Sequence, residues 1–190
     1  MCLFKEKDRY VRTWKQNMTC KKDSLGSKTR SLPKTRYELN LDYLGGFIDG
    51  DGSIFAQIVR REDYKMGFEI RLSVGFYQKS SKHWYILRIQ KYLKSLGVSS
   101  TVQQDKAGMS NCIITGDVGV KKFLIIIIPH LVLKKALGRL ILEIIENKKS
   151  IKTEVDFIKV CALVDKTADY TYSKNRKITA KIVEDHLNSP

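Results

Sequence analysis

The chain has 190 residues, 43% of them hydrophobic, which is enough to bury one substantial core, and its formal net charge is +15. This excess of Lys and Arg indicates a polyanionic partner, although DNA, RNA and anionic membranes all select the same charge. Four widely spaced cysteines without a C-x-x-C pair and three isolated histidines argue against a disulfide scaffold and a zinc site.

Residues 1–36 are polar and strongly basic, with 11 Lys or Arg and 3 acidic side chains. They show no sustained hydrophobic period, so we expect a flexible N-terminal arm that precedes a single domain spanning residues 37–190. An accessory role of the arm in DNA binding and a disordered leader are both compatible with this composition. The arm lacks the apolar core of a secretory signal.

Apolar residues recur at spacings of three and four across residues 37–48, which predicts a helix. Gly45 and Gly46 lie inside it, and each costs up to about 1 kcal/mol relative to alanine. Because glycine lets a second backbone come very close, we expect a compensating contact there. The partner we expect is the same helix of a second copy, related by a two-fold axis.

The predicted helix ends in Asp49-Gly50-Asp51-Gly52. In a two-fold pair of helices the Asp51 carboxylates would meet near two helix C-termini, where like charges repel each other and oppose the helix dipoles. A divalent cation would relieve both effects, so the pattern indicates a magnesium site at a dimer seam. An ordinary Asp-Gly turn is the alternative. A calcium EF-hand is excluded, because Ile54 and Arg60 stand where that loop needs Gly and Glu.

After this motif the hydrophobic period changes to two, which predicts antiparallel strands at residues 53–61 and 68–78 and a second hairpin at about 101–115. The inward positions are Ile54, Ala56, Ile58, Phe68, Ile70, Leu72, Val74 and Phe76. The opposite face carries Phe55, Gln57, Val59, Arg61, Glu69, Arg71, Ser73, Gly75 and Tyr77. That face is either simply solvated or fits the major groove of DNA.

Between the hairpins we expect a helix capped by Ser80 or Ser81 and ended by Gly97. The apolar run at residues 123–128 is too short to span a bilayer and is predicted to be buried core. Further amphipathic helices are predicted at residues 132–147, 153–166 and 180–187. This order of elements predicts an α+β domain with helices on one face of an antiparallel sheet.

The stretch Leu44-Gly-Gly-Phe-Ile-Asp-Gly-Asp-Gly52 resembles the name-giving motif of the LAGLIDADG homing endonucleases, and the similarity runs from about residue 37 to the C-terminus. Only one motif occurs, as in the homodimeric members encoded by organellar group I introns. The resemblance implies an α-β-β-α-β-β-α fold whose saddle-shaped sheet covers DNA. The dimer interface that it implies consists of Leu44, Gly45, Gly46, Ile48 and Asp49.

Hydrolysis of a phosphodiester needs a metal, an activated water and positive charge near the leaving oxygen. The resemblance implies that Asp51 and the Gly50 carbonyl bind Mg²⁺, that Gln78 organises solvent and that Lys134 is the basic active-site residue. Lys82 stands where better-known members have arginine, so bidentate geometry is lost. We expect Mn²⁺ to substitute for Mg²⁺ and Ca²⁺ to bind without supporting cleavage.

The same resemblance assigns DNA contacts to the outer face of the sheet. The expected contact residues are Phe55, Gln57, Val59, Arg61, Glu69, Arg71, Ser73, Tyr77, Gln104, Lys106 and Asn111. Lys174 and Lys177, near the C-terminus, are expected to contact phosphates, with a solvated basic loop as the alternative.

These observations predict a homodimeric, magnesium-dependent endonuclease that cuts both strands of double-stranded DNA at a long pseudo-palindromic target and thereby starts intron homing. We expect an organellar protein, in a chloroplast rather than a mitochondrion, without a membrane partner. An RNA maturase that binds intron RNA and a catalytically inactive DNA-binding protein are the alternatives. Retention of Asp51, Gln78 and Lys134 favours the enzyme. The target, the host gene and the number of metals are left open.

Overall fold

A computed structural model of the chain describes residues 38–171 and 176–189. The predicted arm at residues 1–36 and the predicted phosphate contact Lys174 lie outside these residues. The elements in chain order are α2 (Leu41–Gly50), β1 (Ser53–Arg60), β2 (Phe68–Lys79), the 3₁₀ turn η1 (Ser80–Lys82), α3 (His83–Ser95), β3 (Thr101–Gln104), β4 (Met109–Thr115), α4 (Asp117–Ile127), the 3₁₀ turn η2 (Ile128–His130), α5 (Lys135–Lys149), α6 (Glu154–Lys166), the 3₁₀ turn η3 (Thr167–Tyr170) and α7 (Ala180–Leu187).

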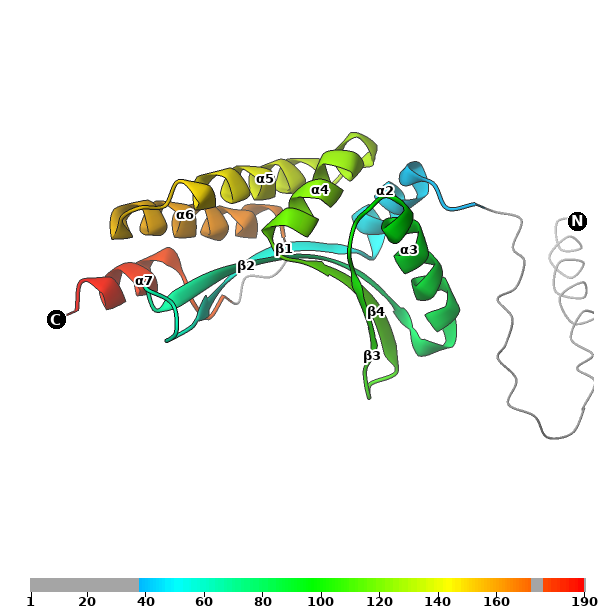
Figure 1. The fold of residues 1–190 in the computed structure, drawn as a ribbon, viewed down its shortest axis with the longest axis horizontal. Coiled ribbons are helices and arrows are strands. Elements are labelled where there is room, and N and C mark those ends of the chain that lie inside the picture. Colours follow the sequence, from blue (N-terminus) through cyan, green and yellow to red (C-terminus); the bar gives the residue numbers. More distant parts are fainter. Residues whose placement is uncertain (1–37, 172–175, 190) are drawn as a thin grey trace, which may run out of the picture. The chain divides into compact units, whose positions relative to one another are not determined.

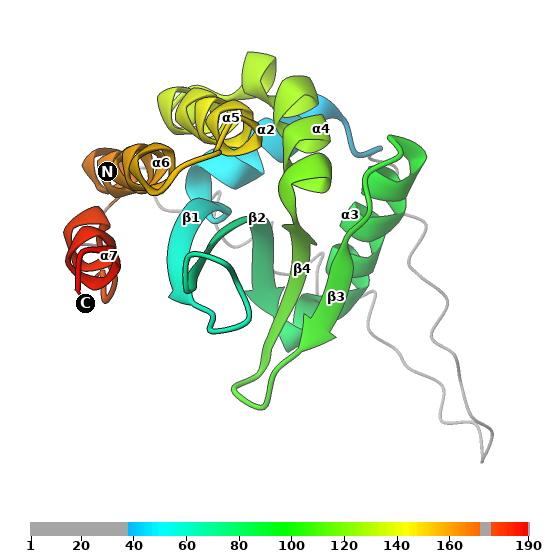
Figure 2. The ribbon, with the colours of Figure 1, turned by 60° about the vertical axis from the view of Figure 1, so that its left-hand side comes forward.

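The four strands form one antiparallel sheet in the order β1-β2-β4-β3. The sheet is strongly curved, and helices α2 to α6 lie on its convex side (Figure 1). A view turned by 60° shows the same helical layer and leaves the opposite side of the sheet without a helix among the described segments (Figure 2). The predicted α+β architecture with helices on one face is therefore confirmed.

The period-two pattern of the strands separates the core from the concave face. On the convex side, the side chains of β1 at Ile54, Ala56 and Ile58 are at most 5% exposed. The apolar side chains of β2 at alternate positions from Phe68 to Phe76 are buried beneath the helices in the same way. Burial of each large apolar side chain stabilises the fold by roughly 1.5–3 kcal/mol, so the alternation fixes which face is left for solvent.

Helix α2 differs from its predicted bounds at both ends. Asn40 is extended and its side chain accepts a hydrogen bond from the Tyr43 N–H at 2.8 Å, so the helix begins at Leu41. It continues to Gly50, two residues beyond the predicted end. A cap residue satisfies free N–H groups without changing the hydrophobic period, which is why the period alone placed the start too early.

Helix α3 starts differently from the prediction. Ser80 and Ser81 belong to η1, and no side chain caps either this turn or the helix that follows it. The first helical residue, His83, instead places Nδ1 3.0 Å from the Oγ of buried Ser110 in β4, within hydrogen-bonding distance. The predicted end is right, because Gly97 has a φ of +69°, where other residues would be strained.

The sequence pattern did not reveal α4. The run at residues 123–128 is the second half of this helix and continues into η2, rather than being uniformly buried core. Phe123 is fully buried, whereas Ile125 is 56% exposed, so the run has two different faces. An uninterrupted apolar run carries no period, which concealed the helix.

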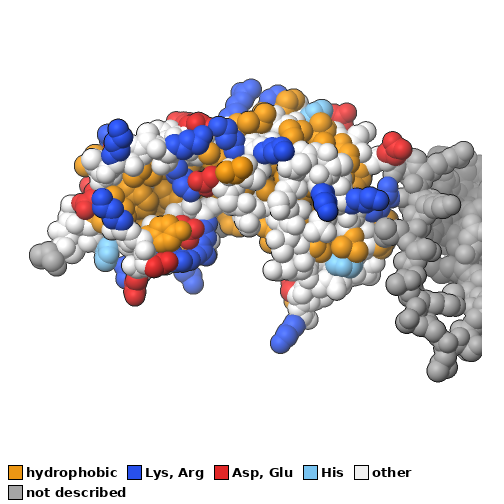
Figure 3. Space-filling view, viewed as in Figure 1, with side chains coloured by type: hydrophobic (Ala, Val, Ile, Leu, Met, Phe, Trp, Pro, Cys, Tyr) orange, Lys and Arg blue, Asp and Glu red, His pale blue; other side chains and the backbone are white. Residues whose placement is uncertain are grey.

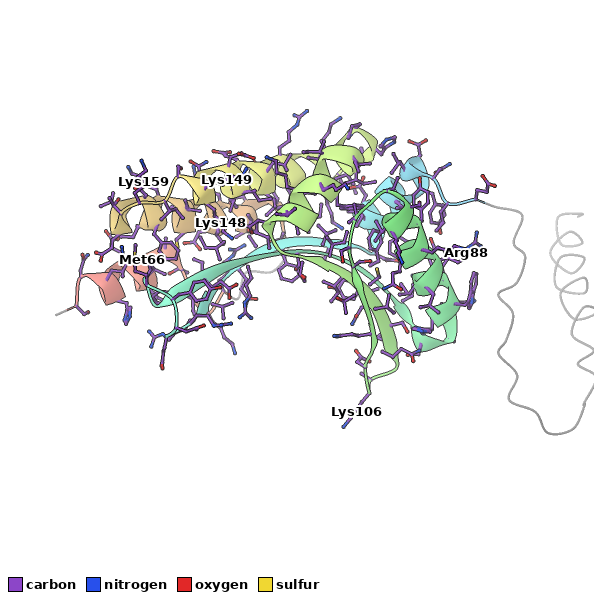
Figure 4. The ribbon with its side chains drawn as sticks, viewed as in Figure 1. Met66, Arg88, Lys106, Lys148, Lys149 and Lys159 are labelled. Carbon is purple, nitrogen blue, oxygen red and sulfur yellow. The ribbon has the colours of Figure 1, made fainter. Side chains whose placement is uncertain are left out.

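The last three predicted helices are present, with differences of up to three residues at the ends of α5 and α6. Helix α5 begins at Lys135 instead of residue 132, because residues 131–134 form an irregular link after η2, and it ends at Lys149. Near the end of α5, Lys148 points to the sheet and its Nζ donates to the Ile70 carbonyl and to Asp117 Oδ1, both at 2.8 Å (Figure 4). Ile70 lies in the part of β2 that is not paired with β4. In the part of the chain that the structure describes, no helix is both long and apolar enough to cross a membrane.

Candidate active site

The chain turns sharply at the C-terminal end of α2. The N–H groups of Asp51 and Gly52 both donate to the Phe47 carbonyl at 2.9 Å. A Cβ atom on Gly52 would lie 2.6 Å from the Ile48 Cα, so only glycine fits at this position. The turn leads directly into β1 and leaves Asp51 exposed at the junction.

Lys134 lies in the link that precedes α5, and its side chain contacts the C-terminal end of α2. Its Nζ donates to the carbonyl oxygens of Ile48, Asp49 and Gly52 at 2.5, 3.1 and 2.8 Å. A cation is favourable here because the helix C-terminus carries partial negative charge. Burial lowers the pKa of Lys134, and the nearby carboxylates of Asp49 and Asp51 oppose that shift.

Asp49 makes the reciprocal contact. Its carboxylate accepts hydrogen bonds from the backbone N–H groups of Val132, Leu133 and Lys134 at 2.7, 3.1 and 2.9 Å. Burial acts to raise the pKa of Asp49, but the three N–H donors outweigh it and hold the pKa below its usual value. The Asp49 carboxylate is thereby engaged in joining α2 to the link and is poorly placed to bind a metal.

The two contacts leave Asp51 and Gly50 as the exposed oxygen donors at this end of α2. Lys134 binds the carbonyls of Ile48, Asp49 and Gly52 but not that of Gly50, and Gly50 is an exposed residue. Among residues 38–171 and 176–189, no three His, Cys, Asp or Glu side chains gather to hold a metal by themselves. One carboxylate and one carbonyl nevertheless suit Mg²⁺, which commonly keeps several waters and takes further oxygens from substrate phosphate.

The other predicted catalytic residues come from the end of β2. Ser53 is paired with Gly75, so the register brings the residues before Ser53 alongside the last residues of β2, where half-buried Gln78 lies. Lys82 follows in η1 and is exposed. The catalytic roles of Gln78 and Lys82 stay predictions.

Tyr77 folds flat across the sheet beside this site. Its hydroxyl lies over Gly75, where an added Cβ would be 2.4 Å away, and accepts a hydrogen bond from Ser53 Oγ at 3.2 Å. The phenol therefore contacts β1 close to Asp51 instead of projecting freely toward a ligand, as a base-reading residue would.

The residues that we expected at a dimer interface separate into two groups. Leu44 and Ile48 are fully buried within their own chain. Gly45 packs on η2, because an added Cβ would lie 2.2 Å from the His130 carbonyl oxygen, so this close contact comes from the same chain and not from a second copy. Gly46 is exposed, and an added Cβ there would meet no atom within 4 Å.

Two apolar side chains next to Asp49 were not identified from the sequence. Val132 and Leu133 are 82% and 77% exposed, although their backbone N–H groups are fixed by Asp49. The sequence pattern placed them in the helix predicted at residues 132–147. The proline that ends the preceding apolar run was the one available sign that the helix begins later.

The expected DNA-contacting residues mostly share the concave face, which remains an open hollow in the space-filling view (Figure 3). Phe55, Gln57 and Arg71 are exposed there. Ser73 lies between β1 and β4 and is only 7% exposed, so it offers little surface to DNA, and its expected contact stays a prediction. Val59, Glu69 and Asn111 occupy this face and are partly exposed.

The register corrects one expected contact in the β3–β4 hairpin. Gln104 pairs with Ser110, whose side chain is buried beneath α3, so Gln104 belongs to the convex side. Gln103 pairs with Asn111 and shares the concave face, a position that sequence reasoning missed by one residue. Lys106 projects from the tip of this hairpin (Figure 4). Lys177 is exposed before α7.

We expect Asp49→Asn to lower the free energy of unfolding by about 2 kcal/mol, because three N–H groups lose a charged acceptor. Urea unfolding measures this, with Asp185→Asn, which changes an exposed carboxylate on α7, as control. Since the pKa of Asp49 lies below its usual 3.8, its contribution is present above that pH and is lost as the pH falls through the lower folded value. Equal losses for both variants would contradict this role.

Comparison with known proteins identifies the family of the chain. The model of the LAGLIDADG endonuclease family matches residues 44–151. The DNA endonuclease I-CvuI of Chlorella vulgaris is 35% identical over 150 residues, which cover 79% of this chain and 91% of that protein. The DNA endonuclease I-CreI of Chlamydomonas reinhardtii is 36% identical over 148 residues, covering 77% of this chain and 88% of the relative.

The solved structures give the same result. I-CvuI in complex with its target superposes with a TM-score of 0.72 at 35% identity, covering 77% of this chain and 91% of that one. The homing endonuclease I-TnaI, at 17% identity, shares the fold with a TM-score of 0.66 over 80% of this chain and 100% of its own. The resemblance seen in the sequence motif is confirmed, and the chain belongs to the LAGLIDADG endonuclease family.

Proposed function

We propose that this chain is a site-specific endonuclease that cuts both strands of DNA by metal-dependent hydrolysis and so starts intron homing. The observation that carries the proposal is the end of α2, where Gly50 and Asp51 are exposed while Lys134 binds the neighbouring carbonyls of Asp49 and Gly52. Two relatives with about one third identity are DNA endonucleases, and I-CvuI has been crystallised with its DNA target. A regulator without catalysis would have no use for these donors.

Each residue of the site has a distinct chemical task. Mg²⁺ held by Asp51 and the Gly50 carbonyl would supply Lewis-acid stabilisation of the phosphoryl oxygens. Lys134 neutralises the end of α2 and keeps positive charge beside the scissile phosphate. Gln78 has both a donor and an acceptor with which to orient a water. Lys82 is exposed and adds a point charge toward a phosphate oxygen.

The DNA partner is supported by shape and charge together. The concave sheet carries Gln57, Arg71 and Gln103, whose side chains can pair with base edges in the major groove. The net charge of +15 favours phosphate contact, and binding should weaken steeply with salt as counterions are released.

The active unit in this proposal is a homodimer. Gly46 on α2 and the exposed apolar side chains of Val132 and Leu133 lie at the same end of the helical layer, joined by the contacts of Asp49. A second copy placed over them by two-fold symmetry would bury this apolar surface and bring two Asp51 residues together, one for each DNA strand. A symmetric dimer implies a long pseudo-palindromic target.

The identity of the metal and the cellular location are further parts of this proposal. I-CvuI was crystallised with its target in 2 mM Ca and with the I-CreI target, uncleaved, in 2 mM Mg. These complexes support use of a divalent metal by this chain. We propose Mg²⁺ as the cofactor, Mn²⁺ as a substitute and Ca²⁺ as a non-productive ion. The proposal places the gene for this chain in an organellar intron, in a chloroplast rather than a mitochondrion.

Cleavage of a randomised duplex library by the purified protein tests the proposal. We expect cuts at one pseudo-palindromic site with Mg²⁺ or Mn²⁺ and none with Ca²⁺. Asp51→Asn should abolish cutting, because a neutral amide is a weaker metal ligand than a carboxylate, while leaving the unfolding midpoint unchanged. A negative result is absence of cleavage at every magnesium concentration across a titration. Absence of cleavage under all metals, with tight binding to the cognate intron RNA, would instead support a maturase.

The dimer is tested by Leu133→Glu, which places a charge in the proposed interface. We expect sedimentation to show a monomer and the cleavage rate to fall by at least tenfold, since double-strand cutting needs both sites. Val155→Glu is the matched control, because Val155 is 58% exposed on α6, on a different part of the surface. A Leu133→Glu protein that sediments and cuts like the control would disprove this interface.

A further inference from the structure

Four charged side chains of the β1–β2 hairpin form a connected network. Arg71 Nε donates to Glu69 Oε2 at 2.8 Å, and Arg61 Nη1 lies 3.7 Å from the same oxygen. Arg61 also pairs with Asp63. Glu69, with a side chain that is 25% exposed, is the most enclosed member. The network therefore centres on one carboxylate set between two arginines.

The two arginines differ in what remains available to a ligand. Arg61 donates through both Nε and Nη2 to the two oxygens of Asp63, at 2.8 and 2.7 Å, and also stacks near the Tyr64 ring. This bidentate contact lowers the pKa of Asp63 to about 2, so the pair persists at neutral pH. One edge of the Arg61 guanidinium is thus occupied by Asp63, and its remaining nitrogen, Nη1, lies 3.7 Å from Glu69, so Arg61 has fewer open donors for a base than Arg71.

Arg71 is held by its Nε–H alone. A guanidinium has five N–H donors, and contact through Nε leaves the two terminal nitrogens as an outward-facing pair. The side chain is 47% exposed, on the face that the helices leave open. The outward pair has the geometry that recognises guanine O6 and N7 in the major groove.

The neighbours of Arg71 fix its place on this face. Gln57 stands directly opposite Arg71 in the β1–β2 register, and Val59 stands opposite Glu69. Glu69 and Arg71 lie two residues apart on one strand, so their side chains leave the sheet on the same side. The hydrogen bond between them restricts the rotamers of Arg71 before any ligand arrives, which reduces the entropic cost of an ordered contact.

We propose that Arg71 reads a guanine in each half of the DNA target and that Glu69 is the positioning residue that makes this contact selective. The inference rests on the proposed function and names a determinant of its specificity. A carboxylate on a DNA-facing surface repels phosphate and costs affinity for every sequence. It offsets that cost by preventing Arg71 from turning to the nearest phosphate, which carries no sequence information.

Sequencing of the DNA bound by the full chain from a randomised duplex library, in calcium so that binding is measured without cleavage, tests the proposal. The wild-type chain should enrich guanine at one symmetric position of each half-site. Arg71→Lys keeps the charge but loses the fork, and Glu69→Ala removes the carboxylate that orients the fork. We expect both to reduce the guanine preference at that position by roughly tenfold and to leave the other positions unchanged.

Two further readouts distinguish positioning from a structural or purely electrostatic role. Glu69→Ala should bind non-cognate duplex more tightly than wild type, whereas Arg71→Lys should not, and the double variant should lose no more preference than Arg71→Lys alone. Glu62→Ala removes the same charge from the exposed turn of the same hairpin and should preserve the guanine preference. Glu69→Asp, whose carboxylate is too short to keep the contact, replaces Glu69→Ala if thermal unfolding shows that the alanine variant is destabilised.

A guanine preference that survives in Glu69→Ala or in Arg71→Lys would overturn the inference, as would its loss in Glu62→Ala. These results are distinct from failure of the proposed function. If the wild-type chain enriches no sequence at all and cuts no duplex, the endonuclease proposal fails and this inference fails with it. If the wild type enriches a target but the Glu69 variants share its profile, only the role of Glu69 is lost.

Discussion

The structure depends on two reciprocal sets of hydrogen bonds, made by charged side chains, between the end of α2 and the link before α5. The Asp49 carboxylate accepts three backbone N–H groups of the link, and the Lys134 ammonium, on that link, donates to three carbonyls at the end of α2. Each partner satisfies polar groups that helix termini and irregular links leave open. Since both groups are engaged within the chain, Asp51 is the carboxylate left exposed at this point, and its place is fixed by its neighbours.

The curved sheet gives the chain two surfaces with opposite tasks. Every second residue of its strands enters the core beneath the helices, so the remaining positions must face the concave side. Polar side chains on that side interact with one another before any partner is present, as Arg61 and Arg71 do with acidic neighbours. Ligand recognition therefore depends on which of these contacts leave a hydrogen-bonding edge free. Two arginines on the same face, Arg61 and Arg71, can therefore differ in their ability to bind a ligand.

Much of this could be predicted from the sequence, for identifiable reasons. Strand faces and helix order follow from hydrophobic periods, and the motif at the end of α2 identified the family and the position of Asp51. Features that depend on contacts distant in sequence could not be predicted. Gly45 packs on a turn 85 residues away in its own chain rather than on a second copy. The hairpin register puts Gln103, and not Gln104, on the concave face, and α4 was concealed in a run without a period.

The central claim is that Asp49 and Lys134 act as one unit to hold Asp51 for metal-dependent hydrolysis. A double-mutant cycle of Asp49→Asn and Lys134→Met, measured as the single-turnover cleavage rate of the selected duplex, tests it most directly. If the two residues act together, the double variant will cut no more slowly than Lys134→Met alone. Losses that multiply, so that the double variant is slower by the product of the two single effects, would show that each residue acts independently and would contradict the claim.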